Sequence, residues 1–273
     1  MSTVTQSASR SSQRRVATAV VLGCLAIAAW AASVDGMSGT EMSDRFSAGS
    51  FGFFVALWVI MMSAMMFPSV WPAVSVYGLV IRRRADAEGR MISRSVMFVA
   101  GYIASWTAVG LVAFGVLAAA RTAGLDRLSD AQVARLVVAP VALAGALYQA
   151  TPLKRACLRH CRGPLSFFME HWRQGLRGAL TMGARHGAYC VGCCWMLMLV
   201  LLALGVMSIT WMVIVALAIA VEKLAPMRWP RLASGLLATG LIALAVVAVV
   251  KPAWLPGVGS GMGGMDGTEE MLK

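Results

Sequence analysis

Thiol side chains gather in two short stretches of the chain, at spacings that could build a metal site. In YCVGCCWMLM they are Cys190, Cys193 and Cys194, and in CLRHC they are Cys157 and Cys161. Residues three and four positions apart share one face of a helix, so each stretch is predicted to present its thiols together. Such groups of thiols bind metal ions or carry out redox chemistry.

Thioether side chains repeat the same spacing in a third stretch, WVIMMSAMMFP, at Met62, Met65 and Met66. Thiolates and thioethers are soft donors, which select Cu(I) over harder ions. Zinc prefers Cys and His ligands, so the mixture favours copper, with zinc as the second choice. The alternative role of the three methionines is packing, because Met fills irregular apolar gaps.

Two further side chains are candidate ligands. His160 lies inside CLRHC and shares its turn with two thiols. Glu222 lies in an apolar segment, where ionisable groups are functional candidates by default; the alternative is an ion pair with Lys223 or a neighbouring Arg. No catalytic residue is predicted, and Cys24 is assigned a small apolar role. The candidate metal ligands are Met62, Met65, Met66, Cys157, His160, Cys161, Cys190, Cys193, Cys194 and Glu222.

The elements that must position these residues are membrane helices. Hydrophobic residues make up 59% of the 273 positions and charged residues only 13%, and a helix needs about 20 apolar residues to cross a bilayer. The sequence predicts an all-α, polytopic bundle of about seven transmembrane helices, over residues 16–34, 51–81, 93–120, 133–150, 187–207, 209–226 and 232–250. The first could instead be a cleaved signal peptide, which would leave six. Its apolar run is longer than the usual 7–15 residues, which favours an uncleaved span.

The basic residues indicate how these helices cross the membrane. With the N-terminus in the cytoplasm, about three quarters of the 24 Lys and Arg residues fall on the cytoplasmic side, as the positive-inside rule requires. This explains the net charge of +12 without a nucleic-acid partner. The same orientation brings the thiols and methionines to the inner side of the bilayer. A reducing compartment argues there against structural disulfides.

The remaining segments complete a single membrane domain over residues 1–273. Residues 1–15 form a cytoplasmic arm, and residues 151–186 form a basic cytoplasmic loop in which LSFFMEHWRQGLRGAL is predicted to be an interfacial amphipathic helix. Residues 252–273 are predicted to be a flexible, Gly- and Met-rich tail. Pro68 and Pro72 predict that the second span ends near Phe67 and continues as a bent helix close to the interface.

At these motifs the sequence resembles a family of bacterial integral membrane proteins predicted to bind metal. The matching pieces are WVIMMSAMMFP, YQATPLKRACLRHCRGP, GAYCVGCCWMLM and VEKLAP. Some members are described as membrane copper chaperones that help to load a tyrosinase-type polyphenol oxidase. The resemblance implies a non-enzymatic protein of the bacterial cytoplasmic (inner) membrane. It would deliver copper to a copper-requiring enzyme or a periplasmic copper carrier.

Two other functions remain open from the sequence. A metal transporter would use the same donors but requires polar or broken helices near the bilayer midplane. A membrane thiol-disulfide oxidoreductase would use Cys190 and Cys193 as a C-x-x-C pair together with a quinone or disulfide partner.

Overall fold

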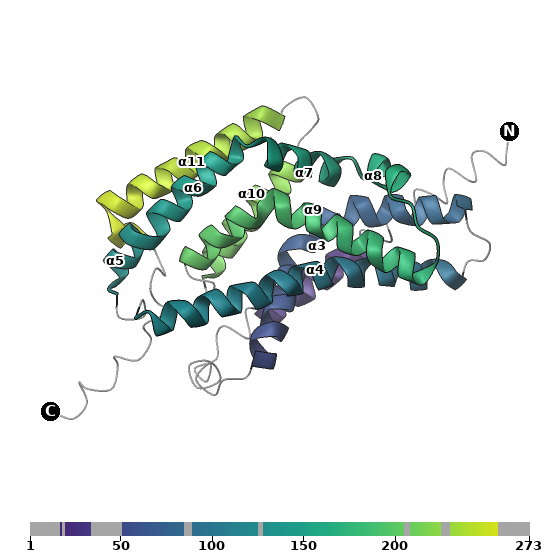
Figure 1. Ribbon diagram of the computed structural model, residues 1–273, viewed down its shortest axis with the longest axis horizontal. Coiled ribbons are helices and arrows are strands. Elements are labelled where there is room, and N and C mark those ends of the chain that lie inside the picture. Colours follow the sequence, from purple (N-terminus) through teal and green to yellow (C-terminus); the bar gives the residue numbers. More distant parts are fainter. Residues whose placement is uncertain are drawn as a thin grey trace. The chain divides into compact units, whose positions relative to one another are not determined.

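The computed structural model describes residues 17, 20–33, 51–84, 89–124, 128–204, 208–224 and 230–255. Over these residues the chain is helical and contains no strand. A short apolar helix, Val20–Ser33, comes first. The elements that follow are α3 (Phe51–Arg84), α4 (Gly89–Thr122), α5 (Asp130–Val133), η2 (Ala134–Val138), α6 (Ala139–Gln149), α7 (Pro152–Arg162), α8 (Pro164–Glu170), α9 (Gly175–Leu204), α10 (Ile209–Leu224), α11 (Pro230–Val250) and η3 (Pro252–Trp254) (Figure 1).

Five stretches of helix in the described residues are long and apolar enough to cross a membrane. They are Phe54–Ile81, Ile92–Ala120, Ala131–Gln149, Gly175–Leu204 and Leu232–Val250. The all-helical, multi-pass prediction therefore fits, and the count of seven is not confirmed by the described residues. The sixth predicted span is α10, whose 16 residues reach only about 24 Å, and Val20–Ser33 is shorter still.

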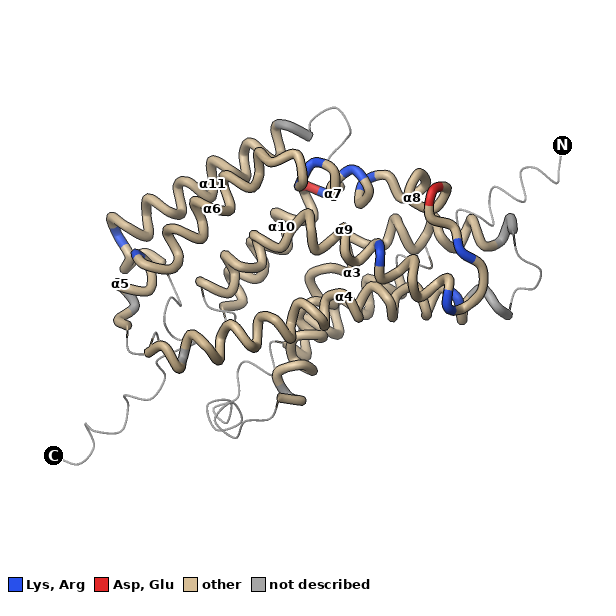
Figure 2. Tube along the Cα trace, in the orientation of Figure 1, with Lys and Arg blue, Asp and Glu red and all other residues tan. Residues whose placement is uncertain are grey.

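Charge is confined to a few places on this scaffold. Figure 2 shows Lys and Arg on α7 and around the connection from α8 to α9, whereas α3, α4, α6 and α11 carry none over most of their described length. Apolar side chains along α4 and α11 remain widely exposed, as expected of surfaces that face lipid, whereas those of α3 are mostly buried. Which side of the membrane each end faces stays a prediction.

The chain divides into two compact units, and each contains pieces that are distant in the sequence. The first unit contains Val55–Gly110 and Ala156–Cys193, together with Met1–Gly36. Its core is an aromatic cluster in which the Tyr77 ring stacks on Phe98 at 4.8 Å and meets Phe168 at 5.2 Å. Phe167 and Phe168 of α8 are fully buried, so aromatic packing fixes α8 against α3 and α4.

The second unit contains Met37–Phe54, Leu111–Arg155 and Cys194–Lys273. Within it α11 packs along α6, beside which it runs in Figure 1. Small residues allow this contact, since Ala142, Gly145 and Ala146 are buried at i, i+3 and i+4 spacing on α6. The π-helical η2 lies just before Pro140, which has no backbone N–H to donate to a carbonyl one turn back. Beside it, the Ala139 N–H donates to the Ala134 carbonyl, which is the π-helical pattern.

Two helix boundaries differ from those predicted. The helix α3 continues through Pro68 and Pro72 to Arg84 instead of ending near Phe67. The segment predicted as one amphipathic helix, LSFFMEHWRQGLRGAL, is divided: α8 ends at Glu170, and α9 begins at Gly175. Gly175 has φ +79°, a backbone conformation that favours glycine, and this allows the chain to turn between the two helices.

Candidate metal centre

The helix α9 brings three thiols together, as the spacing predicted. The Sγ atoms of Cys190, Cys193 and Cys194 all lie within 4.8 Å of one another, and the three side chains are buried. The Cys193 Sγ also lies 3.1 Å from the Cys190 carbonyl oxygen, to which its thiol donates. All six cysteines of the chain are free thiols, so no disulfide occupies this cluster.

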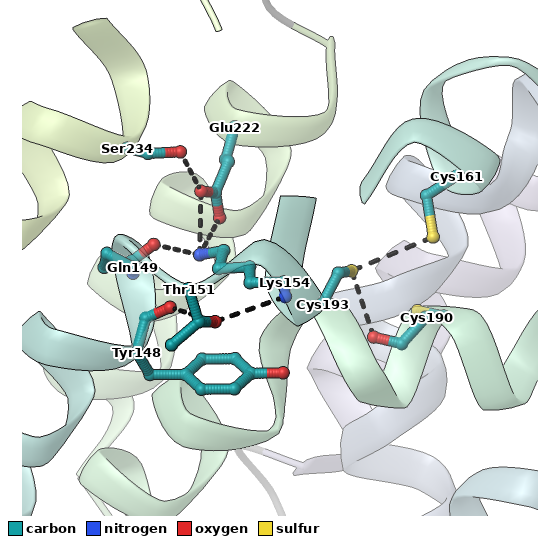
Figure 3. A network of polar contacts seen from close by, with 9 residues as sticks. All are labelled: Tyr148, Gln149, Thr151, Lys154, Cys161, Cys190, Cys193, Glu222 and Ser234. Carbon is teal, nitrogen blue, oxygen red and sulfur yellow. Dashed lines mark hydrogen bonds and ion pairs between the residues drawn. The ribbon is translucent and has the colours of Figure 1, made fainter. Parts of the chain in front are cut away.

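The helix α7 adds the two thiols of CLRHC to the same place. The Cys161 Sγ lies 3.8 Å from the Cys193 Sγ (Figure 3). Cys157 lies against the α9 backbone at Gly192, so closely that a Cβ at that position would be 2.6 Å from its Sγ. Glycine at 192 therefore allows α7 to approach α9. Whether CLRHC folds back onto CVGCC could not be read from the sequence, and the structure shows that it does.

Close packing between α4 and α9 adds a hydroxyl to the cluster. A Cβ on Gly183 of α9 would collide with the Phe98 carbonyl oxygen of α4, so the two backbones touch where the side chain is missing. At the next residue of α9, the Ala184 carbonyl accepts a hydrogen bond of 2.8 Å from the Ser105 hydroxyl of α4. This approach places the Tyr102 hydroxyl 3.0 Å from the Cys190 Sγ.

The electrostatics of the α7 thiols follow from this crowding. Hydrogen bonding with the Cys190 and Cys193 thiols, together with burial, raises the pKa of Cys161 well above its ordinary value. Burial also raises the pKa of Cys157, with a smaller contribution from the neighbouring Cys193. Both side chains therefore hold their protons at neutral pH, and a bound cation would have to displace them.

The spacing of the sulfur atoms suits a single ion. With metal–sulfur bonds of about 2.3 Å, two sulfur ligands of one ion lie at most about 4.6 Å apart. The Cys161–Cys193 separation of 3.8 Å is inside this limit, and the span of the α9 trio is close to it. Thiols on two helices can thus converge on one cation with small side-chain rotations.

The predicted methionine ligands are buried in the first unit. Met62, Met65 and Met66 of α3 have exposed fractions of 2% or less, so they do not face lipid. Burial is compatible both with packing and with metal binding. Their role as ligands stays a prediction.

His160 lies in the last turn of α7. Its ring stacks face to face on Tyr189 of α9, with centroids 4.2 Å apart and an interplanar angle of 3°. Its Nδ1 donates to the Ala156 carbonyl at 2.9 Å. The His160 ring is therefore held in one position. It belongs to the residue before Cys161 and packs on Tyr189, the residue before Cys190.

Glu222 belongs to a network of polar side chains in the second unit. The Lys154 ammonium lies 2.7 Å and 2.8 Å from its two carboxylate oxygens, and the Ser234 hydroxyl donates to one of them at 2.8 Å (Figure 3). Lys154 donates as well to the Gln149 amide oxygen. Glu222 thus forms an ion pair with Lys154. Its role as a metal ligand stays a prediction.

Sequence reasoning missed Tyr102 and Lys154. A lone Tyr in an apolar span carries no signal of a partner 88 residues away. Lys154 could have been found, because the rule that singled out Glu222 also demands a nearby opposite charge, here 68 residues earlier.

The comparisons with curated proteins and with solved structures found no match. A family model described as "PpoB2: Copper chaperone" matches residues 55–248, which include most of α3, the thiols of α7 and α9, and Glu222. The chain thus belongs to the PpoB2 copper chaperone family.

Proposed function

We propose that the protein binds Cu(I) at the thiols of α7 and α9 and delivers it to a copper-requiring enzyme. The observation that supports this most is the meeting of Cys161 with Cys193, since thiols 32 residues apart come within 3.8 Å. The family description as a copper chaperone agrees with this use of the site. The charge pattern supports an N-terminus in the cytoplasm, and the resemblance to bacterial integral membrane proteins supports the bacterial inner membrane.

Burial of the cluster favours Cu(I) over zinc. A tetrahedral zinc site made only of thiolates carries two net negative charges, whereas Cu(I) held by two thiolates carries one. Charge is costly in an apolar interior, and Cys190 and Cys193 are each only 1% exposed. Cu(I), whose site carries the smaller net charge, is therefore the better-suited ion.

Transfer would proceed by ligand exchange. Five thiols on two helices let a bound ion form a new sulfur bond before an old one breaks, so that it is never released as an aqua ion. Met62, Met65 and Met66 are the proposed thioether ligands that extend this path along α3, because neutral soft donors hold Cu(I) more weakly than thiolates do. His160 and Glu222 complete the proposed set of ligands.

The test is the copper content of the full chain purified in detergent. Changing Cys190, Cys193 and Cys194 together to Ser should abolish bound Cu(I). Cys24→Ser is the matched control, since Cys24 is an exposed thiol on the Val20–Ser33 helix, and it should retain copper. Undiminished copper in the triple variant would overturn the proposal. Zinc retained in preference to copper under competition would overturn the choice of ion.

The two other functions give different results in the same preparation. A transporter would move copper across proteoliposomes without an acceptor protein. An oxidoreductase would cycle between thiol and disulfide without metal, which mass spectrometry of alkylated protein would detect.

A further inference from the structure

The thiols of Cys161 and Cys193 meet across the contact between α7 and α9, within the first unit. Their Sγ atoms are 3.8 Å apart, and Figure 3 shows the two side chains reaching toward each other from separate helices. Both are free thiols. The sulfur atoms of a disulfide are about 2.05 Å apart, so rotation of the two side chains has to bring these atoms closer by less than about 2 Å.

The backbone around this pair already allows such a bond. A Cβ at Gly192, the residue before Cys193, would lie 2.6 Å from the Cys157 Sγ, so α7 and α9 approach closely one turn before Cys161. The Cys193 thiol donates its hydrogen to the Cys190 carbonyl at 3.1 Å. Its sulfur lone pairs therefore stay available for a bond to Cys161.

Accessibility decides which thiol reacts first with a molecule in solution. The Cys161 side chain is partly exposed, whereas Cys190 and Cys193 are each 1% exposed and Cys194 is 2% exposed. A small reagent therefore reaches Cys161 before it reaches the thiols of α9. The buried Cys193 thiol, 3.8 Å away, is then placed to react with the modified Cys161.

We propose that Cys161 and Cys193 form a reversible oxidation site, in which a small-molecule disulfide converts the two thiols into one disulfide and so weakens copper binding. The inference rests on the proposed function. On the reducing side of the membrane predicted for these thiols, the dithiol form prevails. The disulfide forms when the ratio of small disulfide to small thiol rises.

The reaction is thiol–disulfide exchange in two steps. In the first step the Cys161 sulfur bonds to one sulfur of the small disulfide, and the other sulfur leaves as a thiol. In the second step the Cys193 sulfur bonds to the Cys161 sulfur, and the second small thiol is released. The pair loses two electrons and two protons, and the small disulfide gains them as it becomes two thiols.

The disulfide and copper compete for the same sulfur atoms. A disulfide between Cys161 and Cys193 removes the pair through which α7 and α9 share an ion. Cys190 and Cys194 remain, so copper is held more weakly instead of being excluded. Copper that is already bound occupies the thiolates and opposes disulfide formation.

The experiment uses the full chain in detergent, free of metal, in anaerobic buffers of graded oxidised and reduced glutathione. The raised pKa of Cys161 leaves little thiolate at neutral pH, so each sample is followed to equilibrium. Alkylation and mass spectrometry map the disulfide. Glutathione is then removed, because its own thiol binds Cu(I), and copper affinity is measured by chelator competition.

In the oxidised samples, we expect one disulfide between Cys161 and Cys193 and a copper affinity at least about tenfold lower than in the reduced samples. Reduced glutathione should restore the affinity, and copper added first should prevent the disulfide. Cys161→Ser keeps the three thiols of α9, and its affinity should not change on oxidation. Cys24→Ser is the matched control, since Cys24 is exposed on another helix, and it should form the disulfide at the wild-type glutathione ratio.

Three results overturn the oxidation site. They are the absence of a disulfide in the oxidised samples, a disulfide between Cys190 and Cys193 as in the oxidoreductase alternative, and a Cys161→Ser variant that loses affinity on oxidation as the wild type does. Failure of the proposed function shows separately, as a fully reduced wild-type protein that takes up no copper.

Discussion

The two compact units each contain a buried cluster of polar side chains. The clusters differ in whether their members carry opposite charges or are chemically alike. In the second unit Lys154 and Glu222 have opposite charges and share hydrogen bonds with Gln149 and Ser234. In the first unit Cys157, Cys161, Cys190 and Cys193 are alike, and the proximity of Cys190 and Cys193 raises the pKa of Cys161. The Lys154–Glu222 cluster is electrostatically complete, whereas the thiol cluster becomes favourable when a cation replaces its protons. A complementary cluster supports the fold, and a cluster of like groups indicates a binding site.

The largest effect should come from breaking the complementary cluster. Lys154→Met leaves the Glu222 carboxylate buried without its cation, and we expect a loss of about 3–5 kcal/mol in the free energy of unfolding. Chemical unfolding in detergent would measure it. Lys154→Met/Glu222→Leu removes both charges and should recover most of the loss. A single variant as stable as the wild type would show that the pair does not support the fold.

A smaller loss should follow from forcing α7 away from α9. In Gly192→Ala the new methyl group would lie 2.6 Å from the Cys157 Sγ, so we expect a loss of about 1–3 kcal/mol in stability and weaker copper binding. Gly240→Ala is the matched control, since nothing lies within 4 Å of a Cβ at that position of α11, and it should be neutral or slightly stabilising. Equal behaviour of the two variants would contradict the close approach.

The pH dependence of copper affinity tests whether copper replaces protons on the buried thiols. Because the pKa values of Cys157 and Cys161 are raised, their thiols stay protonated below their ordinary pKa, and each copper–sulfur bond must release a proton. Apparent affinity should therefore rise with pH, by about tenfold per pH unit for each proton displaced, and fall as pH falls. Competition with a Cu(I) chelator from pH 6 to 8 would measure the slope.

Cys161→Ser is the variant that tests this origin of the slope. If Cys161 is a ligand, its loss should reduce the slope by about one proton. A slope that stays the same would mean that copper does not displace the Cys161 proton.

The smallest effect concerns the hydroxyl beside the cluster. Tyr102→Phe removes the contact between Tyr102 and Cys190, and we expect copper affinity to fall by about 0.5–1.5 kcal/mol, because a hydrogen bond to the thiolate favours its charged form. Chelator competition at one pH is sufficient. Tyr148→Phe, which changes a ring packed on Trp195 in the second unit, should leave the affinity unchanged.

Much of the fold could be predicted because membrane helices are encoded locally. The apolar runs matched helices at every place where residues are described, and only their lengths and ends differed. The division of LSFFMEHWRQGLRGAL depended on burial of Phe167 and Phe168 in an aromatic core. That burial fixes α8 against helices distant in the sequence, so no local periodicity could reveal it.

The sequence alone determined that the protein is helical and apolar, and that Cys190, Cys193 and Cys194 share one helical face, because these properties follow from composition and from the helical repeat. Only the tertiary structure decided that Cys161 meets Cys193, that Tyr102 meets Cys190 and that Glu222 pairs with Lys154. Those contacts join residues 32, 88 and 68 positions apart. They depend on how closely helices can approach, which small residues such as Gly183 and Gly192 set only once their partner helices are in place.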